Sequence, residues 1–221
     1  MRASVDLKPT LTFLGDLKRN NNKAWFDANR ARYEDAKGRF ESFVDALITE
    51  LDKFENLGGV TAKDSTFRIN RDILFSKDKT PYKTNMSADI APGGRKSGKH
   101  GYYIHLAPGG ETMLAGGMYM PTPEQLSKFR AVIAADAKPL KGITGNRTFV
   151  KTFGSLDGDR LKTAPKGFPA DHPEIELLKL KQLVVAHRFS DREVLAPTFI
   201  GEMTGTCKAL KPFLDYLNAT V

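Results

Sequence analysis

Apolar residues recur at helical spacing at both ends of the chain. Near the start they predict a helix from Pro9 to Lys18 and a second, longer helix between Asn22 and Gly58. The Asn22 side chain suits the N-cap of the second helix because it can accept a hydrogen bond from an unpaired backbone N–H. A kink is expected at Gly38. A final helix carries the apolar stripe Ile200, Met203, Cys207, Leu210, Leu214 and Leu217, with a kink expected at Pro212.

The middle of the chain has a different pattern, in which short runs rich in β-branched and aromatic residues are separated by turn residues. These runs predict strands at Thr66 to Arg71, Met86 to Ile90, Tyr102 to Leu106, Thr112 to Tyr119 and Leu183 to Phe189. A hairpin turn is expected at residues 108–111. Gly116-Gly117 indicates a bulge or a close approach of other backbone.

The remaining segments complete a prediction of fold class. Further helices are expected at Pro123 to Ala135 and at Pro173 to Leu180, with a loop-rich region over residues 138–168. Ser190 and Glu193 fit a capping box before the final helix. We therefore predict a single α+β domain over residues 1–221, with a central antiparallel sheet flanked by N- and C-terminal helices.

Composition narrows the class of protein. Hydrophobic residues make up 40% of the chain, there is one cysteine, and no run approaches the length of a membrane span. The first eight residues lack the apolar core of a secretory signal, so a cytoplasmic protein is expected, without a disulfide framework or membrane contact.

The net charge is +8, and residues 63–100 hold nine Lys or Arg against four Asp or Glu. This local surplus favours an anionic ligand, and a basic surface that only aids solubility is the alternative.

Residues 68–85 concentrate functional side chains around the apolar anchors Phe75 and Tyr82. They predict an anion pocket in which arginines fork to a carboxylate or phosphate and lysines add positive charge. The predicted ligand-binding residues are Arg68, Asn70, Arg71, Asp72, Lys77, Asp78, Lys79, Tyr82, Lys83, Asn85 and, on a later strand, His105. The alternative is an ion-paired turn that fixes the edge of the sheet.

Strand alternation makes Arg71 and Asp72 decisive for this choice. A regular strand would send Phe67 and Ile69 to the core and Arg68, Asn70 and Asp72 to the opposite face. Arg71 would then face the core side and require a carboxylate, with Asp78 or Asp89 the nearest in sequence. If the strand instead ends at Asn70, both side chains can converge on one cavity.

Several other chemistries are not supported by the sequence. Residues 93–99 match the Gly-x4-Gly-Lys spacing of a nucleotide P-loop, but His100 replaces the Ser or Thr and a strand follows, so we expect a basic loop. The four histidines do not form a metal site, and His105 alone is considered as an acid or base. Cys207 lies on an apolar stripe and is expected to be a buried thiol. No cofactor or metal is predicted, and the sequence does not decide whether the protein is an enzyme.

The run from Arg71 to Asn85 closely resembles the hallmark of an uncharacterised family, domain of unknown function 2461. Asn21-Asn22-Lys23-Ala24-Trp25-Phe26, residues 101–109 and residues 116–121 look like its other recurring blocks, and the resemblance spans about Leu11 to Leu217. Many members have Arg where this chain has Leu74. The resemblance implies one conserved unit and supplies neither an activity nor catalytic residues.

The leading hypothesis is therefore a basic cleft on residues 68–85 that binds a small anionic ligand, with or without catalysis. In it Arg68 and Arg71 clamp the anion and Tyr82 closes one wall, and Asp72 or Asp78 could serve as a general base. The alternatives are a nucleic-acid binding module that stacks bases on Tyr82, Tyr102 and Tyr103, and a protein-interaction scaffold in which the motif is a structural ion-pair clamp. The sequence does not predict the oligomeric state.

Overall fold

The computed structural model describes residues 5–74, 76–156 and 158–220. Their internal contacts divide the chain into two compact units, one containing residues up to Leu114 together with Arg188–Gly205, and the other containing Ala115–His187 and the chain from Thr206 onward. Phe75, an anchor of the predicted motif, lies outside the described residues, as do residues 1–4. The prediction of a single domain stays a prediction.

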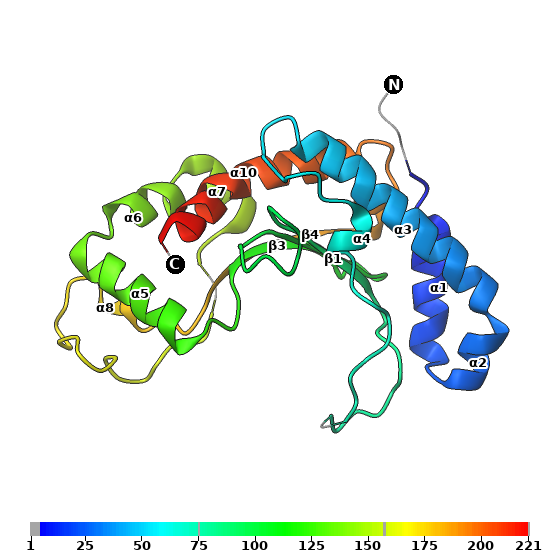
Figure 1. Ribbon diagram of the computed structural model, residues 1–221, viewed down its shortest axis with the longest axis horizontal. Coiled ribbons are helices and arrows are strands. Elements are labelled where there is room, and N and C mark those ends of the chain that lie inside the picture. Colours follow the sequence, from blue (N-terminus) through cyan, green and yellow to red (C-terminus); the bar gives the residue numbers. More distant parts are fainter. Residues whose placement is uncertain (1–4, 75, 157, 221) are drawn as a thin grey trace. The chain divides into compact units, whose positions relative to one another are not determined.

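The first unit begins with three helices, α1 (Lys8–Arg19), α2 (Lys23–Ala28) and α3 (Arg30–Leu51) (Figure 1). The predicted cap is confirmed, because the Asn22 side chain accepts a hydrogen bond from the Trp25 N–H at 2.9 Å. The single long helix is wrong: the chain breaks at Asn29, whose side chain donates back to the Trp25 carbonyl. At Gly38 the helix continues without a break.

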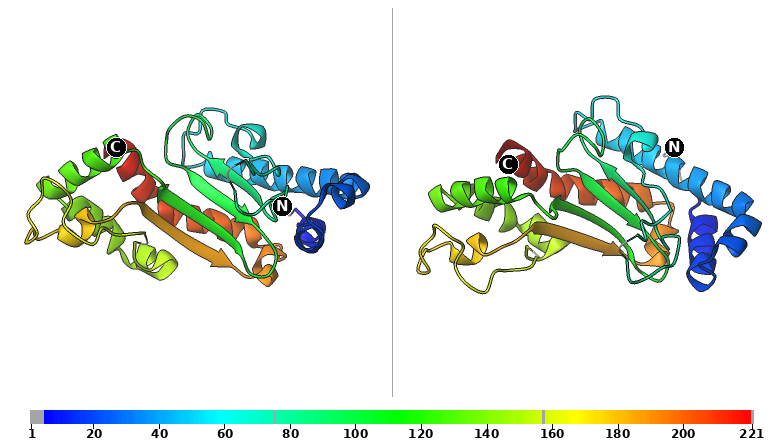
Figure 2. Two further views of the ribbon diagram at one scale, coloured as in Figure 1. Left: turned by 90° about the horizontal axis from the view of Figure 1, so that it is seen from below. Right: turned by 60° about the horizontal axis from the view of Figure 1, so that its bottom comes forward.

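The chain forms the predicted antiparallel sheet from four of the five expected strands, in the order β1 (Met86–Ile90), β2 (Tyr102–Leu106), β3 (Thr112–Met118) and β4 (Leu183–Phe189) (Figure 2). In the first unit, β1 pairs with β2 so that Ala88 lies opposite Ile104 and Asp89 opposite Tyr103. Ala88 and Ile104 are fully buried, whereas Asp89 and Tyr103 are half-buried on the opposite face. The sheet therefore has an apolar face and a polar face.

Helices cover the apolar face in the first unit. The Phe43 ring of α3 stacks on Phe199 at the start of α10 (Phe199–Thr220), with centroids 5.3 Å apart. Two short helices, α4 (Ala62–Ser65) and α9 (Asp191–Val194), complete this unit, and the predicted capping box of Ser190 and Glu193 is present at α9. The predicted turn at residues 108–111 is held by the Asp191 carboxylate, which accepts hydrogen bonds from the N–H groups of Gly109 and Gly110.

The second unit contains α5 (Pro123–Ala135), α6 (Lys138–Thr144), α7 (Arg147–Phe153), α8 (Ile175–Leu178) and the C-terminal part of α10. The expectation of a loop over residues 138–168 is wrong for its first half, because α6 and α7 form there. Their apolar residues Leu140, Phe149 and Phe153 are buried, and this burial outweighs the weak local helix signal.

The predicted close approach at Gly117 is confirmed, since a Cβ there would lie 2.1 Å from the Leu183 carbonyl oxygen.

Residues 66–74 and 76–85, here called the arm, leave the strands of the first unit on the side away from α3 (Figure 1). They do not form the predicted regular strand from Thr66 to Arg71. Among the described residues of the arm, the bridges are isolated ones, Thr66 with Ala88 and Asn70 with Tyr82, although Lys83 and Arg71 donate backbone hydrogen bonds to Ile69 and Pro81. Ile69 is buried as predicted, but Phe67 is 38% exposed, because the pairing is too irregular to keep alternate residues on one face.

Candidate functional site

The arm is anchored to the N-terminal helices at Tyr82. The Asn21 side chain accepts a hydrogen bond from the Tyr82 N–H at 3.1 Å and donates one to the Tyr82 carbonyl at 2.8 Å. The Tyr82 ring stacks on Phe26 with centroids 3.9 Å apart and is buried. Tyr82 is therefore primarily an anchor, and its burial removes it as a platform for stacking bases.

The outer part of the arm is held by its own side chains. The Arg71 guanidinium donates to the Asp78 carboxylate and to the Thr80 hydroxyl. Asp78 also accepts the Thr80 N–H at 2.9 Å, and these hydrogen bonds, with that of Arg71 the strongest, lower the pKa of Asp78 to about 2. Lys79 donates to the Ile73 carbonyl, and Asp72 accepts the Leu74 N–H. Asp78 is thus the carboxylate that Arg71 finds, and Arg71 and Asp72 do not converge on one cavity.

An open hollow of about 410 Å³ lies between the arm and α1 in the first unit. Its lining consists of Lys18, Asn21, Arg71, Asp78, Thr80, Tyr82, Lys83, Thr84 and Asn85. Most of its charge is compensated, because Arg71 pairs with Asp78 and Lys18 lies 3.5 Å from Glu111. Lys83 is the cation of this lining for which the described residues provide no ion pair.

Lys83 belongs to a second group of residues, here called the Phe67 cluster, which consists of Phe67, Arg68, Lys83 and Arg95. The Lys83 Nζ lies 5.5 Å and the Arg95 Cζ lies 5.2 Å from the centroid of the Phe67 ring. Burial lowers the pKa of Lys83, and the like charges of Arg68 and Arg95 lower it further. Two cations, Lys83 and Arg95, therefore share one partly exposed aromatic ring, and the charge of Arg68 acts on the same lysine.

The positive charge of the Phe67 cluster is not neutralised by ion pairs. Across residues 5–74, 76–156 and 158–220, neither Arg68, Lys83 nor Arg95 lies within ion-pair distance of a carboxylate. The Arg95 Nε is buried and has no hydrogen-bond acceptor within the same residues. A buried donor without an acceptor is uncommon in folded proteins because desolvation of the N–H is not compensated.

The polar face of the sheet adjoins the cluster. The Tyr103 ring packs edge-on against Phe67 at 6.3 Å and lies 6.5 Å from the His105 ring. Asp89, opposite Tyr103 in the β1–β2 register, has its pKa raised to about 6 by burial, against a smaller opposing effect of Arg95. Burial lowers the pKa of His105, with Glu111 opposing and Arg188 adding to the shift.

The structure thus brings together only part of the predicted set. Arg68 and Lys83 lie near enough for their charges to repel, and Tyr103 packs between Phe67 of this cluster and His105. Arg71, Asp72, Asp78 and Lys79 stabilise the outer arm instead, and Asn85 lines the hollow. Asn70 and Lys77 are exposed, Asn70 pairing through its backbone with Tyr82.

Three residues of the candidate site were not predicted as ligand-binding: Phe67, Asp89 and Arg95. Phe67 was assigned to the core by strand alternation, and Asp89 was considered only as a partner of Arg71. The signal for Arg95 was present in the expected basic loop, which the structure confirms between β1 and β2. In this loop Gly93 and Gly94 adopt positive φ values of 78° and 84°, which suit glycine and fold the chain tightly before Arg95.

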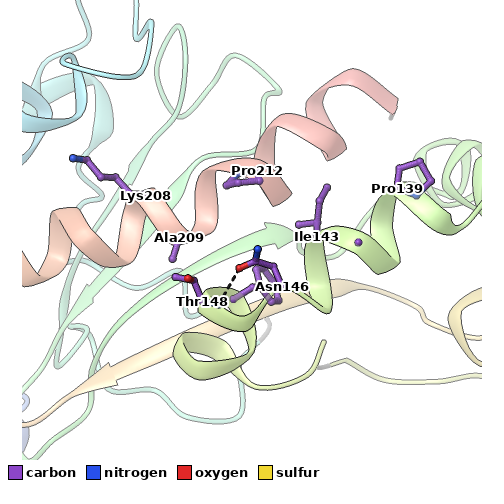
Figure 3. Close-up of a pocket in the computed structure, with 9 residues that line it drawn as sticks. Pro139, Ile143, Asn146, Thr148, Lys208, Ala209 and Pro212 are labelled. Carbon is purple, nitrogen blue, oxygen red and sulfur yellow. Dashed lines mark hydrogen bonds between the residues drawn. The ribbon is translucent and has the colours of Figure 1, made fainter.

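A different hollow lies within the second unit between α6, α7 and α10, with a volume of about 360 Å³ (Figure 3). Its lining is largely apolar, including Pro139, Ile143 and Pro212. The Asn146 side chain is used as the N-cap of α7, where it accepts the Thr148 N–H at 2.9 Å. This hollow gathers no group of charges comparable to the Phe67 cluster, so we take the cluster as the candidate site.

A family model described as "Conserved hypothetical protein (DUF2461)" matches residues 9–216. The chain belongs to this family. The arm, the anchoring Asn21 and strand β2 of this DUF2461 protein all fall within the match. No curated protein and no solved structure matches the chain.

The described residues of the DUF2461 chain hold neither a cluster of metal ligands nor a membrane-spanning helix. Within them, no three His, Cys, Asp or Glu side chains come close enough to hold a metal ion. None of the described helices combines the length and the apolar character needed to cross a membrane. Cys207 is fully buried, as predicted from its position on an apolar stripe.

Proposed function

We propose that this DUF2461 protein binds a small ligand carrying a phosphate or carboxylate group at the Phe67 cluster, with or without turnover. The observation that carries the proposal is the buried Arg95 Nε without an acceptor, in a group of three cations without a paired carboxylate. A cytoplasmic setting, expected from the composition, is part of the proposal.

The electrostatics of the cluster favour an anion over water. Lys83 is half-buried, and the neighbouring charges of Arg68 and Arg95 make its protonated form more costly. An anion placed among the three side chains would relieve this repulsion and accept the N–H of Arg95. Charge-assisted hydrogen bonds to guanidinium and ammonium groups are among the strongest that proteins form, and a planar guanidinium matches carboxylate and phosphate geometry.

Titration calorimetry with inorganic phosphate and pyrophosphate, at low and physiological salt, tests the proposal. Lys83→Met and Arg95→Met should each weaken binding about tenfold or more, as expected for the loss of one charge-assisted hydrogen bond. Lys96→Met is the matched control, because it removes the same charge from an exposed position beside Arg95. It should change the affinity less than about twofold.

Two results would overturn the proposal. One is the absence of binding by either probe to the wild-type protein. The other is an equal loss of affinity in Lys96→Met and Lys83→Met, which would indicate a diffuse positive surface rather than a site.

Nucleic-acid binding is the competing function, and we do not favour it. Of the three tyrosines considered as stacking platforms, Tyr82 and Tyr102 are 6% and 1% exposed, which leaves only Tyr103. Binding of a single-stranded oligonucleotide whose affinity falls steeply between low and physiological salt would support this alternative. A protein partner that still binds after the cluster cations are replaced would support the scaffold hypothesis.

A further inference from the structure

Asp89 is an acidic group placed beside the proposed anion site. It lies on the polar face of the sheet, directly opposite Tyr103, whose ring packs against Phe67. Gly101 leaves room for it, since a Cβ on that residue would lie 2.7 Å from the Asp89 Oδ1. The carboxyl is therefore fixed close to the Phe67 cluster by the register of β1 and β2.

The Asp89 carboxyl is not used by the protein itself. Over the described ranges it makes no hydrogen bond and no ion pair, although it is half-buried. Arg95 acts on it through space and lowers its pKa, but the two groups are not within ion-pair distance. Burying a carboxylate without a partner is costly, because the charged form loses its hydration. At Asp89 this desolvation, which raises the pKa, outweighs the charge of Arg95, which lowers it.

We propose that Asp89 binds an ammonium group of the ligand, so that the ligand class is a zwitterion such as an amino acid or an aminophosphonate. This inference rests on the proposed function, in which the anionic group of the same ligand lies among Arg68, Lys83 and Arg95. The ammonium group would lie between the Asp89 carboxylate and the face of Tyr103.

The chemistry of the two residues supports this class of ligand. A carboxylate is an acceptor only, so it requires a donor or a cation to offset its desolvation. An aromatic face attracts ammonium groups by cation–π interaction. A simple anion would satisfy the cluster but leave Asp89 repelling the ligand, whereas a zwitterion satisfies both.

The test compares two probes that differ by one amino group, aminomethylphosphonate and methylphosphonate, by titration calorimetry at pH 7.5. The wild-type protein should bind the aminated probe about tenfold more tightly, the effect of one charge-assisted hydrogen bond. In Asp89→Asn this advantage should fall below about twofold, while methylphosphonate binds as well as or better than to the wild type because a negative charge has been removed. Asp72→Asn, which removes the same charge from the exposed outer arm, should keep the wild-type preference.

The outcomes separate this inference from the proposed function. If methylphosphonate binds but the amino group brings no advantage, or if Asp89→Asn keeps the advantage, the zwitterion inference is overturned and anion binding stands. If neither probe binds to the wild-type protein, both are overturned. Circular dichroism and thermal unfolding of Asp89→Asn establish that any change in preference occurs in a folded protein.

Discussion

The side chain of Asn21 makes with Tyr82 both of the hydrogen bonds that a neighbouring β-strand would make. Its amide accepts from the Tyr82 N–H and donates to the Tyr82 carbonyl, so the arm is fixed to the loop between α1 and α2 without a strand in that loop. Tyr82 adds its ring stack on Phe26 of α2. Two residues sixty-one positions apart in sequence, both in segments that lie within the family match, are thus held together directly.

Asn21→Ala should loosen the arm. It leaves a backbone donor and acceptor of buried Tyr82 without partners, which costs about 1–3 kcal/mol of unfolding free energy. Urea denaturation measures this loss, and limited trypsin digestion should cut faster at Lys77 and Lys79. Asn21→Asp keeps the acceptor but loses the donor, so an intermediate loss is expected. Unchanged digestion of Asn21→Ala would contradict an anchoring role.

Strand β2 was predictable because its burial alternates with a period of two. In β2, Tyr102, Ile104 and Leu106 are buried while Tyr103 and His105 are not, and the sequence pattern indicates the same faces. The two helices α6 and α7 were missed because each is seven residues long and has glycines around it. Their stability comes from burying Leu140, Phe149 and Phe153, which a local pattern does not reveal.

Two glycines provide a test of the packing. Gly117 has φ of 129° and lies against the Leu183 carbonyl, so Gly117→Ala should lower the unfolding free energy by about 3 kcal/mol. Gly38 lies inside α3 with open space around it, so Gly38→Ala should raise the unfolding free energy by about 0.5–1 kcal/mol. Thermal or urea unfolding checks both signs. A stable Gly117→Ala protein would contradict the close approach of backbone.

The candidate site was predictable in its charge but not in its geometry. Local charge surplus pointed to the right region, because Arg68, Lys83 and Arg95 all lie between residues 63 and 100. Which cations pair internally depends on how the arm folds back on itself, and this is set by the contacts of Arg71 with Asp78 and of Asn21 with Tyr82. Alternation also failed at Phe67, since the arm is not a regular strand.

Asp89→Asn should stabilise the protein at neutral pH while impairing recognition of the ligand amino group. The folded protein raises the pKa of Asp89 from 3.8 to about 6, so it binds a proton more tightly than the unfolded chain does. The contribution of Asp89 to the free energy of unfolding therefore falls as pH rises from 3.8 to about 6. At pH 7.5 the neutral amide should be more stable by about 1–3 kcal/mol.

Urea denaturation of both proteins at pH 4 and pH 7.5 measures this effect, because their difference cancels the other titrating groups. The advantage of Asp89→Asn should be large at pH 7.5 and small at pH 4. Lower stability of the variant at pH 7.5 would mean that the carboxylate has a stabilising partner. Higher stability would fit a residue kept for binding at some cost to the fold.

Arg71→Ala separates the structural role of the outer arm from ligand binding. If Arg71 clamped the anion, as the sequence analysis expects, this change would abolish binding and leave the fold intact. Because the guanidinium contacts Asp78 and Thr80, we now expect faster hydrogen exchange at the Thr80 and Lys83 amides of the arm. Phosphate affinity should change less than about threefold, since Arg71 is already neutralised by Asp78 and its charge adds little to the field at the cluster.

The effect on pH dependence has a definite sign. The hydrogen bond from Arg71 is the largest cause of the lowered pKa of Asp78. The pair therefore stabilises the arm at pH values above 3.8, the pKa of Asp78 in the unfolded chain. This contribution is lost as pH falls towards about 2. In Arg71→Ala the pKa of Asp78, followed by carboxyl NMR shifts, should rise towards 3.8. Loss of phosphate binding with unchanged amide exchange would reverse the assignment and make Arg71 a ligand-binding residue, because a group that only holds the arm together cannot affect binding without affecting the arm.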